Sequence, residues 1–155
     1  MKKNIIFIVC IFLALLLDQI IKQVILHYGE IGNPLFQSKF IDIVLVFNKG
    51  VAFSLGSFFG EWLKWIILAL LFVMLFIIKI SKDLFENYYI YFGLILGSGF
   101  SNVLDRFIHN GVVDYIFWHY GFNFAVFNLA DSIINISIAC IIIQYLYKSR
   151  KEKNV

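Results

Sequence analysis

The sequence predicts an all-α integral membrane protein with four transmembrane helices and a small interfacial platform in the outer loop, for which β structure is an open alternative. The first indication is composition: 61% of the 155 residues are hydrophobic and 15% are charged, whereas soluble domains are about 45–50% apolar and about 25% charged. The second is a set of four continuous apolar stretches, each close to the roughly 20 residues that cross a hydrocarbon core. Neither a repeat nor a linker interrupts the chain, so we expect one domain over residues 1–155.

The four apolar stretches are residues 4–26, 62–80, 88–104 and 127–147. They are continuous rather than alternating, which favours helices over a transmembrane barrel. The first stretch follows Lys2 and Lys3 and so resembles a signal peptide, but no small-residue cleavage site comes after it. We therefore expect it to stay as a membrane helix.

Basic residues predict which ends of these helices face the cytoplasm. Eight of them fall on one side: Lys2, Lys3, Lys79, Lys82, Lys148, Arg150, Lys151 and Lys153. Three fall on the other side: Lys39, Lys49 and Arg106. The positive-inside rule then places both termini in the cytoplasm, with segments 26–61 and 105–126 outside.

Polar residues on three of the helices are predicted to meet in one layer near the outer face. Asp18 lies about 21 Å along the first helix from its start, in the outer third of the bilayer, at a rise of 1.5 Å per residue. Asn102 lies at the outer end of the third helix, and Asn128 and Asp131 lie at the outer start of the fourth. Ionisable residues at membrane depth are costly, so such a layer indicates a functional site.

Each of these polar residues also has a structural alternative. Asp18 and Lys22 are four residues apart on one helical face and could form only an internal ion pair. Asp131 could serve the start of the fourth helix, where the helix dipole favours an anion. Asp105 is expected to pair with the adjacent Arg106 at a helix end rather than to act in catalysis.

Other site chemistries are not favoured. The small residues of GLILGSGFS (93–101) have the spacing of close helix packing, which we prefer to a serine nucleophile. Without an H-E-x-x-H pair, we expect no metal and no cofactor. Cys10 and Cys140 lie in apolar runs and are expected to pack as small hydrophobes. The basic residues are dispersed, so nucleic acid is not an expected partner.

Four sequence blocks, in the same order, are similar to blocks of the lipoprotein signal peptidase family, the type II signal peptidases. They are DQIIK (18–22), NKGVAFS (48–54), SNVLDRFIHNGVVDY (101–115) and FNLAD (127–131). The predicted four-helix topology agrees with that of the family. Ser101 is a departure, because the family usually has glycine just before the asparagine of the third block. We expect slightly altered helix packing at Ser101 and no lost chemistry.

The resemblance implies a membrane aspartic endopeptidase of the bacterial cytoplasmic membrane, with its active site near the outer face. Asp114 and Asp131 would form the catalytic dyad, and the resemblance, not their spacing, implies that they meet. Two carboxyls close together in a low-dielectric site share one proton. The ionised one can activate a water while the protonated one polarises the scissile carbonyl. Substrate-binding or supporting roles are implied for Asp18, Lys22, Asn48, Gly50, Asn102, Arg106 and Asn128.

The same resemblance implies the partners. The substrate would be a prolipoprotein with diacylglyceryl on a cysteine, cut just before that cysteine in contact with membrane lipids. Globomycin-type cyclic lipopeptides would inhibit the cleavage. The aromatic and glycine-rich segment 48–59 is expected to form an interfacial platform or lid.

Two other classes of protein remain as alternatives. A small polytopic transporter or ion-pathway subunit would place its polar residues near the midplane or along a whole path. A structural membrane scaffold would account for the helices but not for the outer polar layer.

Overall fold

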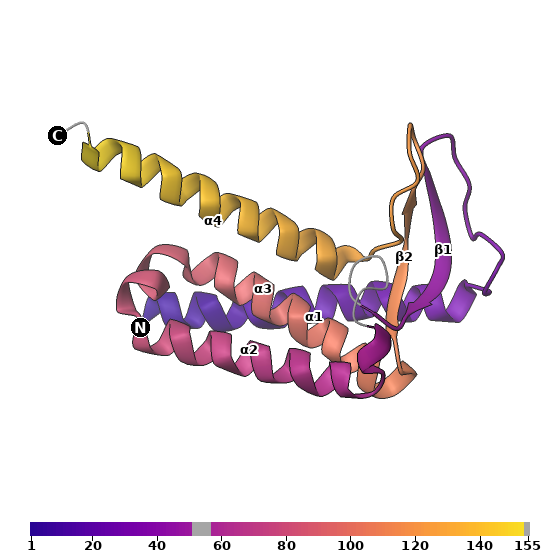
Figure 1. Ribbon diagram of the computed structural model, residues 1–155, viewed down its shortest axis with the longest axis horizontal. Coiled ribbons are helices and arrows are strands. Elements are labelled where there is room, and N and C mark those ends of the chain that lie inside the picture. Colours follow the sequence, from indigo (N-terminus) through magenta and orange to yellow (C-terminus); the bar gives the residue numbers. More distant parts are fainter. Residues whose placement is uncertain (51–56, 154–155) are drawn as a thin grey trace.

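The computed structural model describes residues 1–50 and 57–153, which form four long helices, a short 3-10 turn and a two-stranded sheet. The helices are α1 (Lys2–Tyr28), α2 (Trp62–Ile80), α3 (Lys82–His109) and α4 (Leu129–Lys153). The strands are β1 (Ile41–Asn48) and β2 (Val112–Trp118), and the 3-10 turn η2 is Ser57–Phe59. Both chain termini lie at one end of the helices and the sheet lies at the other (Figure 1).

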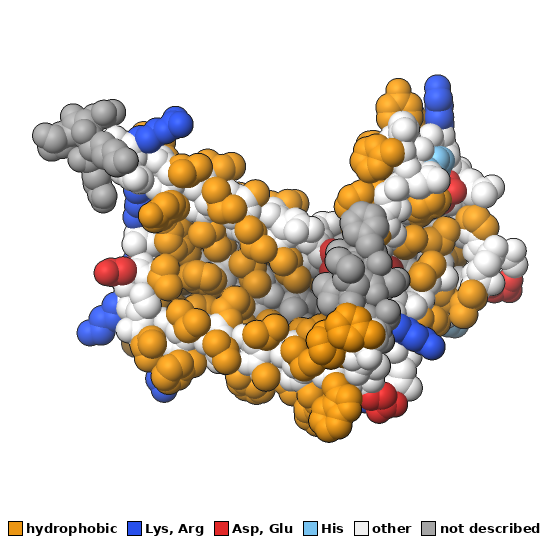
Figure 2. All heavy atoms as spheres, viewed as in Figure 1, with side chains coloured by type: hydrophobic (Ala, Val, Ile, Leu, Met, Phe, Trp, Pro, Cys, Tyr) orange, Lys and Arg blue, Asp and Glu red, His pale blue; other side chains and the backbone are white. Residues whose placement is uncertain are grey.

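Three of the helices, α1, α2 and α4, are long and apolar enough to cross a membrane. Their outer surfaces carry large exposed apolar side chains, such as Phe12 and Leu16 on α1 and Phe76 on α2. Figure 2 shows hydrophobic side chains along the helices, with charged side chains mainly toward the two ends of the molecule. The chain is therefore a mostly helical membrane protein with three candidate spans and a small antiparallel sheet.

Helix α3 is the central helix and contacts α1, α2 and α4. Two glycines allow α1 to approach it closely. A Cβ atom on Gly97 would lie 2.2 Å from the carbonyl oxygen of Ile11, and one on Gly93 would lie 2.7 Å from that of Phe7. The helix-packing role predicted for the small residues of 93–101 is confirmed.

The bounds of α3 differ from the predicted 88–104. The helix begins at Lys82, because its polar first turn needs no apolar residue and Asp83 suits the positive end of the helix dipole. It continues to His109 and ends where Asn110 takes a left-handed conformation, with φ of 54°. The prediction that Arg106 lies in the outer loop was therefore wrong, since Arg106 belongs to the last turn of α3.

The outer segments contain a small β-sheet, which was the open alternative in the fold prediction. Its strands lie almost entirely outside the segment 48–59, where the platform was expected. β1 pairs with β2 in antiparallel register from Ile41 opposite Trp118 to Asn48 opposite Val112. The platform or lid predicted for 48–59 falls partly on residues 51–56, outside the described residues. The second strand comes instead from the last outer segment, where the β-branched and aromatic run VVDYIFW favours strand structure.

Candidate active site

Backbone hydrogen bonds join the strand and the helix that carry the two aspartates of the implied dyad. The amides of Tyr115 and Ile116 donate to the carbonyl oxygen of Phe127 at 3.0 and 2.8 Å, and the amide of Phe127 donates back to Ile116 at 3.1 Å. The Tyr115 hydroxyl accepts the first amide of α4 at 3.0 Å. This pairing fixes the start of α4 against β2, and so Asp114 and Asp131 reach one site although 17 residues separate them.

Asn128 contacts both aspartates. Its side-chain amide donates to Oδ1 of Asp114 at 2.7 Å, and its backbone amide donates to Oδ2 of Asp131 at 3.1 Å. The amide of Asp131 returns a 2.9 Å bond to the side-chain oxygen of Asn128, which makes a reciprocal cap of α4. The capping alternative for Asp131 is thus confirmed, and the same contacts bring it toward Asp114.

Asp114 lies in β2, outside the helices, and only 2% of it is exposed. Its second oxygen accepts a 2.9 Å bond from the side-chain amide of Asn48, whose own oxygen accepts the amide of Gly50 at 2.9 Å. Burial raises the pKa of Asp114 to about 7, and the negative charge of Asp131 adds to the rise. The bonds from Asn48 and Asn128 act in the opposite direction. Asp114 can therefore hold a proton near neutral pH.

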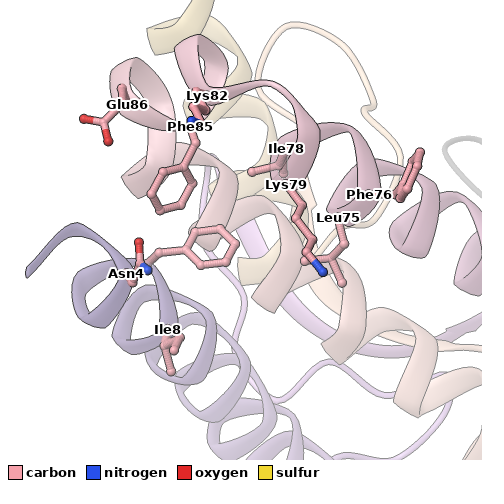
Figure 3. Close-up of a pocket in the computed structure, with 10 residues that line it drawn as sticks. Asn4, Ile8, Leu75, Phe76, Ile78, Lys79, Lys82, Phe85 and Glu86 are labelled. Carbon is pink, nitrogen blue, oxygen red and sulfur yellow. The ribbon is translucent and has the colours of Figure 1, made fainter. Parts of the chain in front are cut away.

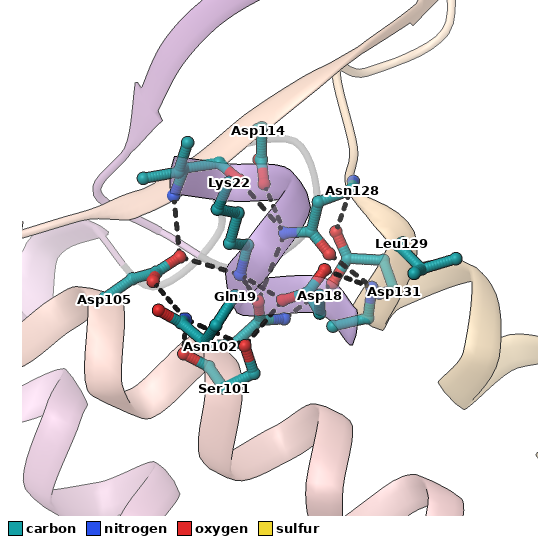
Figure 4. Close-up of polar contacts among 12 residues, drawn as sticks. Asp18, Gln19, Lys22, Ser101, Asn102, Asp105, Asp114, Asn128, Leu129 and Asp131 are labelled. Atoms are coloured by element: carbon teal, nitrogen blue, oxygen red, sulfur yellow. Dashed lines mark hydrogen bonds and ion pairs between the residues drawn. The ribbon is translucent and has the colours of Figure 1, made fainter. Parts of the chain in front are cut away.

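A fully buried cation lies beside these groups. Lys22 Nζ is 2.7 Å from Oδ2 of Asp18 and 2.7 Å from Oδ2 of Asp105. Figure 4 shows Lys22 of α1 pointing between these carboxylates. The predicted Asp18–Lys22 ion pair is confirmed. Lys22 also donates to the side-chain oxygen of Asn102 at 2.8 Å, so that the amide nitrogen of Asn102 faces Asp131 at 2.9 Å.

The expected pairing of Asp105 with Arg106 was wrong. Adjacent residues on a helix do not face each other, and Asp105 points toward α1. There its Oδ2 pairs with Lys22 and accepts the backbone amide of Val113 at 3.0 Å, while its Oδ1 accepts a 2.7 Å bond from Gln19. Asp105 thus ties α1, α3 and β2 together, which is a structural role of the kind predicted but with other partners.

Arg106 turns instead toward the segment that follows β1. Its Nη2 donates to the carbonyl oxygen of Gly50 at 2.5 Å, and its Nη1 donates to that of Asn102 at 3.1 Å. Its buried Nε has no hydrogen-bond partner among residues 1–50 and 57–153. Arg106 and Gly50 are therefore each one hydrogen bond removed from an aspartate: Arg106 contacts Asn102, which donates to Asp131, and Gly50 contacts Asn48, which donates to Asp114.

Three hydrogen bonds of the buried cluster were not predicted from the sequence. The Ser101 hydroxyl donates to Oδ2 of Asp18 at 2.6 Å, so this residue does more than alter packing. Gln19 donates to the Ser101 hydroxyl at 2.9 Å. The other oxygen of Asp18 accepts the amide of Ala130 at 2.9 Å, which anchors the start of α4. The signal for the Gln19–Ser101 bond was a polar glutamine directly after Asp18 in an apolar stretch.

The fold and this cluster define a small helical membrane protein with a buried acidic site where a helix bundle meets a two-stranded sheet. Residues 10–147 match the model of the family described as Signal peptidase (SPase) II. The chain belongs to this family, the lipoprotein signal peptidases, which are proteases that cleave signal peptides from prolipoproteins.

Two bacterial relatives match this chain over most of its length. A lipoprotein signal peptidase of Helicobacter pylori (strain Shi470) is 45% identical over 153 residues, which are 98% of this chain and 94% of that protein. One of Campylobacter jejuni (serotype O:6, strain 81116) is 46% identical over 140 residues, covering 90% and 86%.

Two bacterial membrane enzymes, solved by the in meso method at 2.3 and 1.9 Å, superpose with TM-scores of 0.76 and 0.77 at 27% and 26% identity. The first covers 92% of this chain and 88% of its own, and the second covers 90% and 92%. The protein is a bacterial membrane protein, and the transporter alternative is not supported.

Proposed function

We propose that the protein is an aspartic endopeptidase that cuts diacylglyceryl-modified prolipoproteins just before the lipidated cysteine, with Asp114 and Asp131 as its catalytic pair. The observation that carries the proposal is the sharing of Asn128, which donates to one carboxyl at 2.7 Å and to the other at 3.1 Å. Two carboxyls held close together, one of them almost fully buried, cannot both ionise readily, so they share one proton.

The shared proton divides the work between the two carboxyls. The ionised one takes a proton from a water, whose oxygen attacks the scissile carbonyl carbon. The protonated one donates a hydrogen bond to the carbonyl oxygen, and a proton passes to the leaving amine as the C–N bond breaks. The pKa of about 7 allows Asp114 to carry the shared proton at neutral pH.

Amide side chains hold this pair in position. Asn48 and Asn128 donate to Asp114, while Asn102 donates to Asp131, so each carboxylate has a fixed orientation. Because hydrogen bonds to the charged form lower a carboxyl pKa, the bonds from Asn48 and Asn128 also oppose the rise that burial causes in the pKa of Asp114. We assign all three to positioning.

Arg106 and Gly50 are proposed to meet the substrate backbone. The buried Nε of Arg106 is a strong donor without an acceptor among the described residues, and a substrate carbonyl would satisfy it. Gly50 is held by Arg106 through its carbonyl oxygen. Asp18 and Lys22 form a buried ion pair that supports the site, because Lys22 also donates to Asn102.

We further propose four membrane spans, with α3 as the fourth, in a single domain over 1–155. α3 has 28 residues, about 42 Å at 1.5 Å per residue, so its polar ends can lie at the two interfaces. The excess of basic residues at the end that holds both termini supports a cytoplasmic location for them (Figure 1). The site then lies near the outer face of the cytoplasmic membrane, with the sheet as an interfacial platform.

The proposal is tested by incubating the purified protein in detergent with a diacylglyceryl-prolipoprotein and with the same protein lacking the lipid. Signal peptide should be released only from the lipidated form. A globomycin-type cyclic lipopeptide should block release by occupying the space between the carboxyls, while chelators and serine-directed reagents should not. Activity that is lost with a chelator and restored by zinc would refute the metal-free mechanism.

A further inference from the structure

A groove lies at the end of the molecule that holds both termini, opposite the acidic site. We call it the terminal groove, and its lining comes from the first two turns of α1, the last turns of α2 and the start of α3: Asn4, Phe7, Ile8, Leu75, Phe76, Ile78, Lys79, Lys82, Phe85 and Glu86. Its volume is about 570 Å³, within the roughly 300–1,000 Å³ of typical ligand pockets. Figure 3 shows α1 on one side and α2 on the other, with the start of α3 between them.

The walls of the terminal groove are mainly hydrocarbon, with Asn4 as the uncharged polar residue of the lining. Phe7 and Ile8 of α1 face it from one side and Leu75 of α2 from the other. Phe85 of α3 packs edge-on against Phe7, with ring centroids 5.5 Å apart. An apolar groove between membrane helices has no favourable contact with water, so an acyl chain is the occupant that suits its walls.

The lining of the terminal groove is positively charged overall. Lys79 and Lys82 line it, are exposed, and make no ion pair within residues 1–50 and 57–153. Glu86, the acidic residue of the lining, is already paired with Lys3. Asp83 is the other acidic side chain in this turn of α3, and it is not part of the lining.

The start of α3 adds to this positive field. α3 begins at Lys82, and the side chain of Ser81 makes no hydrogen bond that caps it. The positive end of the helix dipole therefore lies at Lys82, where it favours an anion.

We propose that the terminal groove binds one anionic phospholipid, with an acyl chain between α1 and α2 and the phosphate against Lys79 and Lys82. Basic pockets between membrane helices take anionic headgroups in this way. A zwitterionic lipid would bring its own cation to the lysines, and free phosphate would leave the apolar walls uncovered. The bound lipid would fill the gap between α1 and α2 and stabilise the bundle, far from the prolipoprotein site.

The test uses the purified full-length protein in neutral detergent. Native mass spectrometry measures lipid binding, and the thermal midpoint measures the stabilisation that the lipid gives. The ligands are phosphatidylglycerol, phosphatidylcholine and inorganic phosphate. Phosphatidylglycerol alone should bind with saturation and raise the midpoint. The variant Lys79→Gln/Lys82→Gln should bind it about 25-fold more weakly, at about fivefold for each lysine near an anionic headgroup.

Two further variants separate this site from general charge attraction. Arg150→Gln/Lys151→Gln removes the same charge from the end of α4, outside the groove, and should bind like the wild type. Ile8→Trp leaves the charge unchanged but fills the groove, and should abolish the saturable binding. Equal binding of the two lipids, equal loss from both charge variants, intact binding by Ile8→Trp, or stabilisation by phosphate alone would each overturn the proposal.

Discussion

The hydroxyl of Ser101 donates a 2.6 Å hydrogen bond to the buried carboxylate of Asp18, whereas the sequence predicted only slightly altered helix packing at that position. The same carboxylate accepts the amide of Ala130 in the first turn of α4. The serine therefore adds a donor to the contact through which α1 holds the start of the helix that carries Asp131.

Ser101→Ala should lower the stability of the protein, because it removes this donor without changing the backbone. Hydrogen bonds to charged groups contribute about 1.5–3 kcal/mol. The measurement is the thermal midpoint in detergent. Ser98→Ala is the matched control, since Ser98 is a buried serine of the same helix whose hydroxyl has no partner among the described residues. Equal effects of the two substitutions would contradict the role given to Ser101.

Lys22→Met should destabilise the protein severely. It leaves the carboxylates of Asp18 and Asp105 without the cation that lies 2.7 Å from each, and breaking a buried pair costs about 3–5 kcal/mol. Adding Asp105→Asn to Lys22→Met removes one of the two unpaired charges and should restore part of the thermal midpoint. A Lys22→Met protein as stable as the wild type would show that the cation is not needed.

The layer in which these groups meet could be predicted, because the rise of a helix fixes the depth of each residue. Asp18, Asn102, Asn128 and Asp131 all belong to the observed cluster. The partners within the layer could not be predicted in the same way. Asp105 pairs with Lys22 because of how α3 is rotated against α1, and that rotation depends on contacts such as those at Gly97.

The position of Asp114 was harder still to derive from sequence. A short apolar run such as VVDYIFW has no periodicity that separates a strand from other buried structure. Its partner strand, Ile41–Asn48, lies more than 60 residues earlier in the chain. The return of the chain from β2 to Phe127 also depends on non-local hydrogen bonds. For this reason the meeting of Asp114 with Asp131 came from family resemblance alone.

Asn48→Ala should move the alkaline limb of the pH profile of cleavage to higher pH. The singly protonated pair is lost as the pH rises through the higher of its two pKa values, which produces the alkaline limb of kcat/KM. Burial raises the pKa of Asp114 to about 7 and the bond from Asn48 lowers it, so removing that bond raises this pKa further. Asn33→Ala, an exposed amide of the same outer segment, is the control. An alkaline limb that stays in place or moves to lower pH would contradict the assignment.

The orientation can be measured by thiol labelling. Cysteines introduced at Gln37 and Asn123, both exposed near the sheet, should react with a membrane-impermeant reagent in intact cells. A cysteine at Lys151 should react only after the membrane is opened. The parent protein should carry Cys10→Ala and Cys140→Ala, so that only the introduced thiols are labelled. The reverse pattern would place the acidic site at the cytoplasmic face.

Initial cleavage rates of aspartate-to-asparagine variants test the catalytic pair most directly. Asparagine keeps the shape of the side chain and removes the ionisable oxygen. Loss of one general acid or base costs about 10²–10⁴-fold in rate, and residues that act as a unit lose most of it at the first substitution. Asp114→Asn and Asp131→Asn should each nearly abolish cleavage in protein that is folded and still binds inhibitor, and the double variant should be barely slower. Asp18→Asn and Asp105→Asn should lose rate only together with thermal stability. Substantial cleavage by well-folded Asp114→Asn or Asp131→Asn protein would contradict the account.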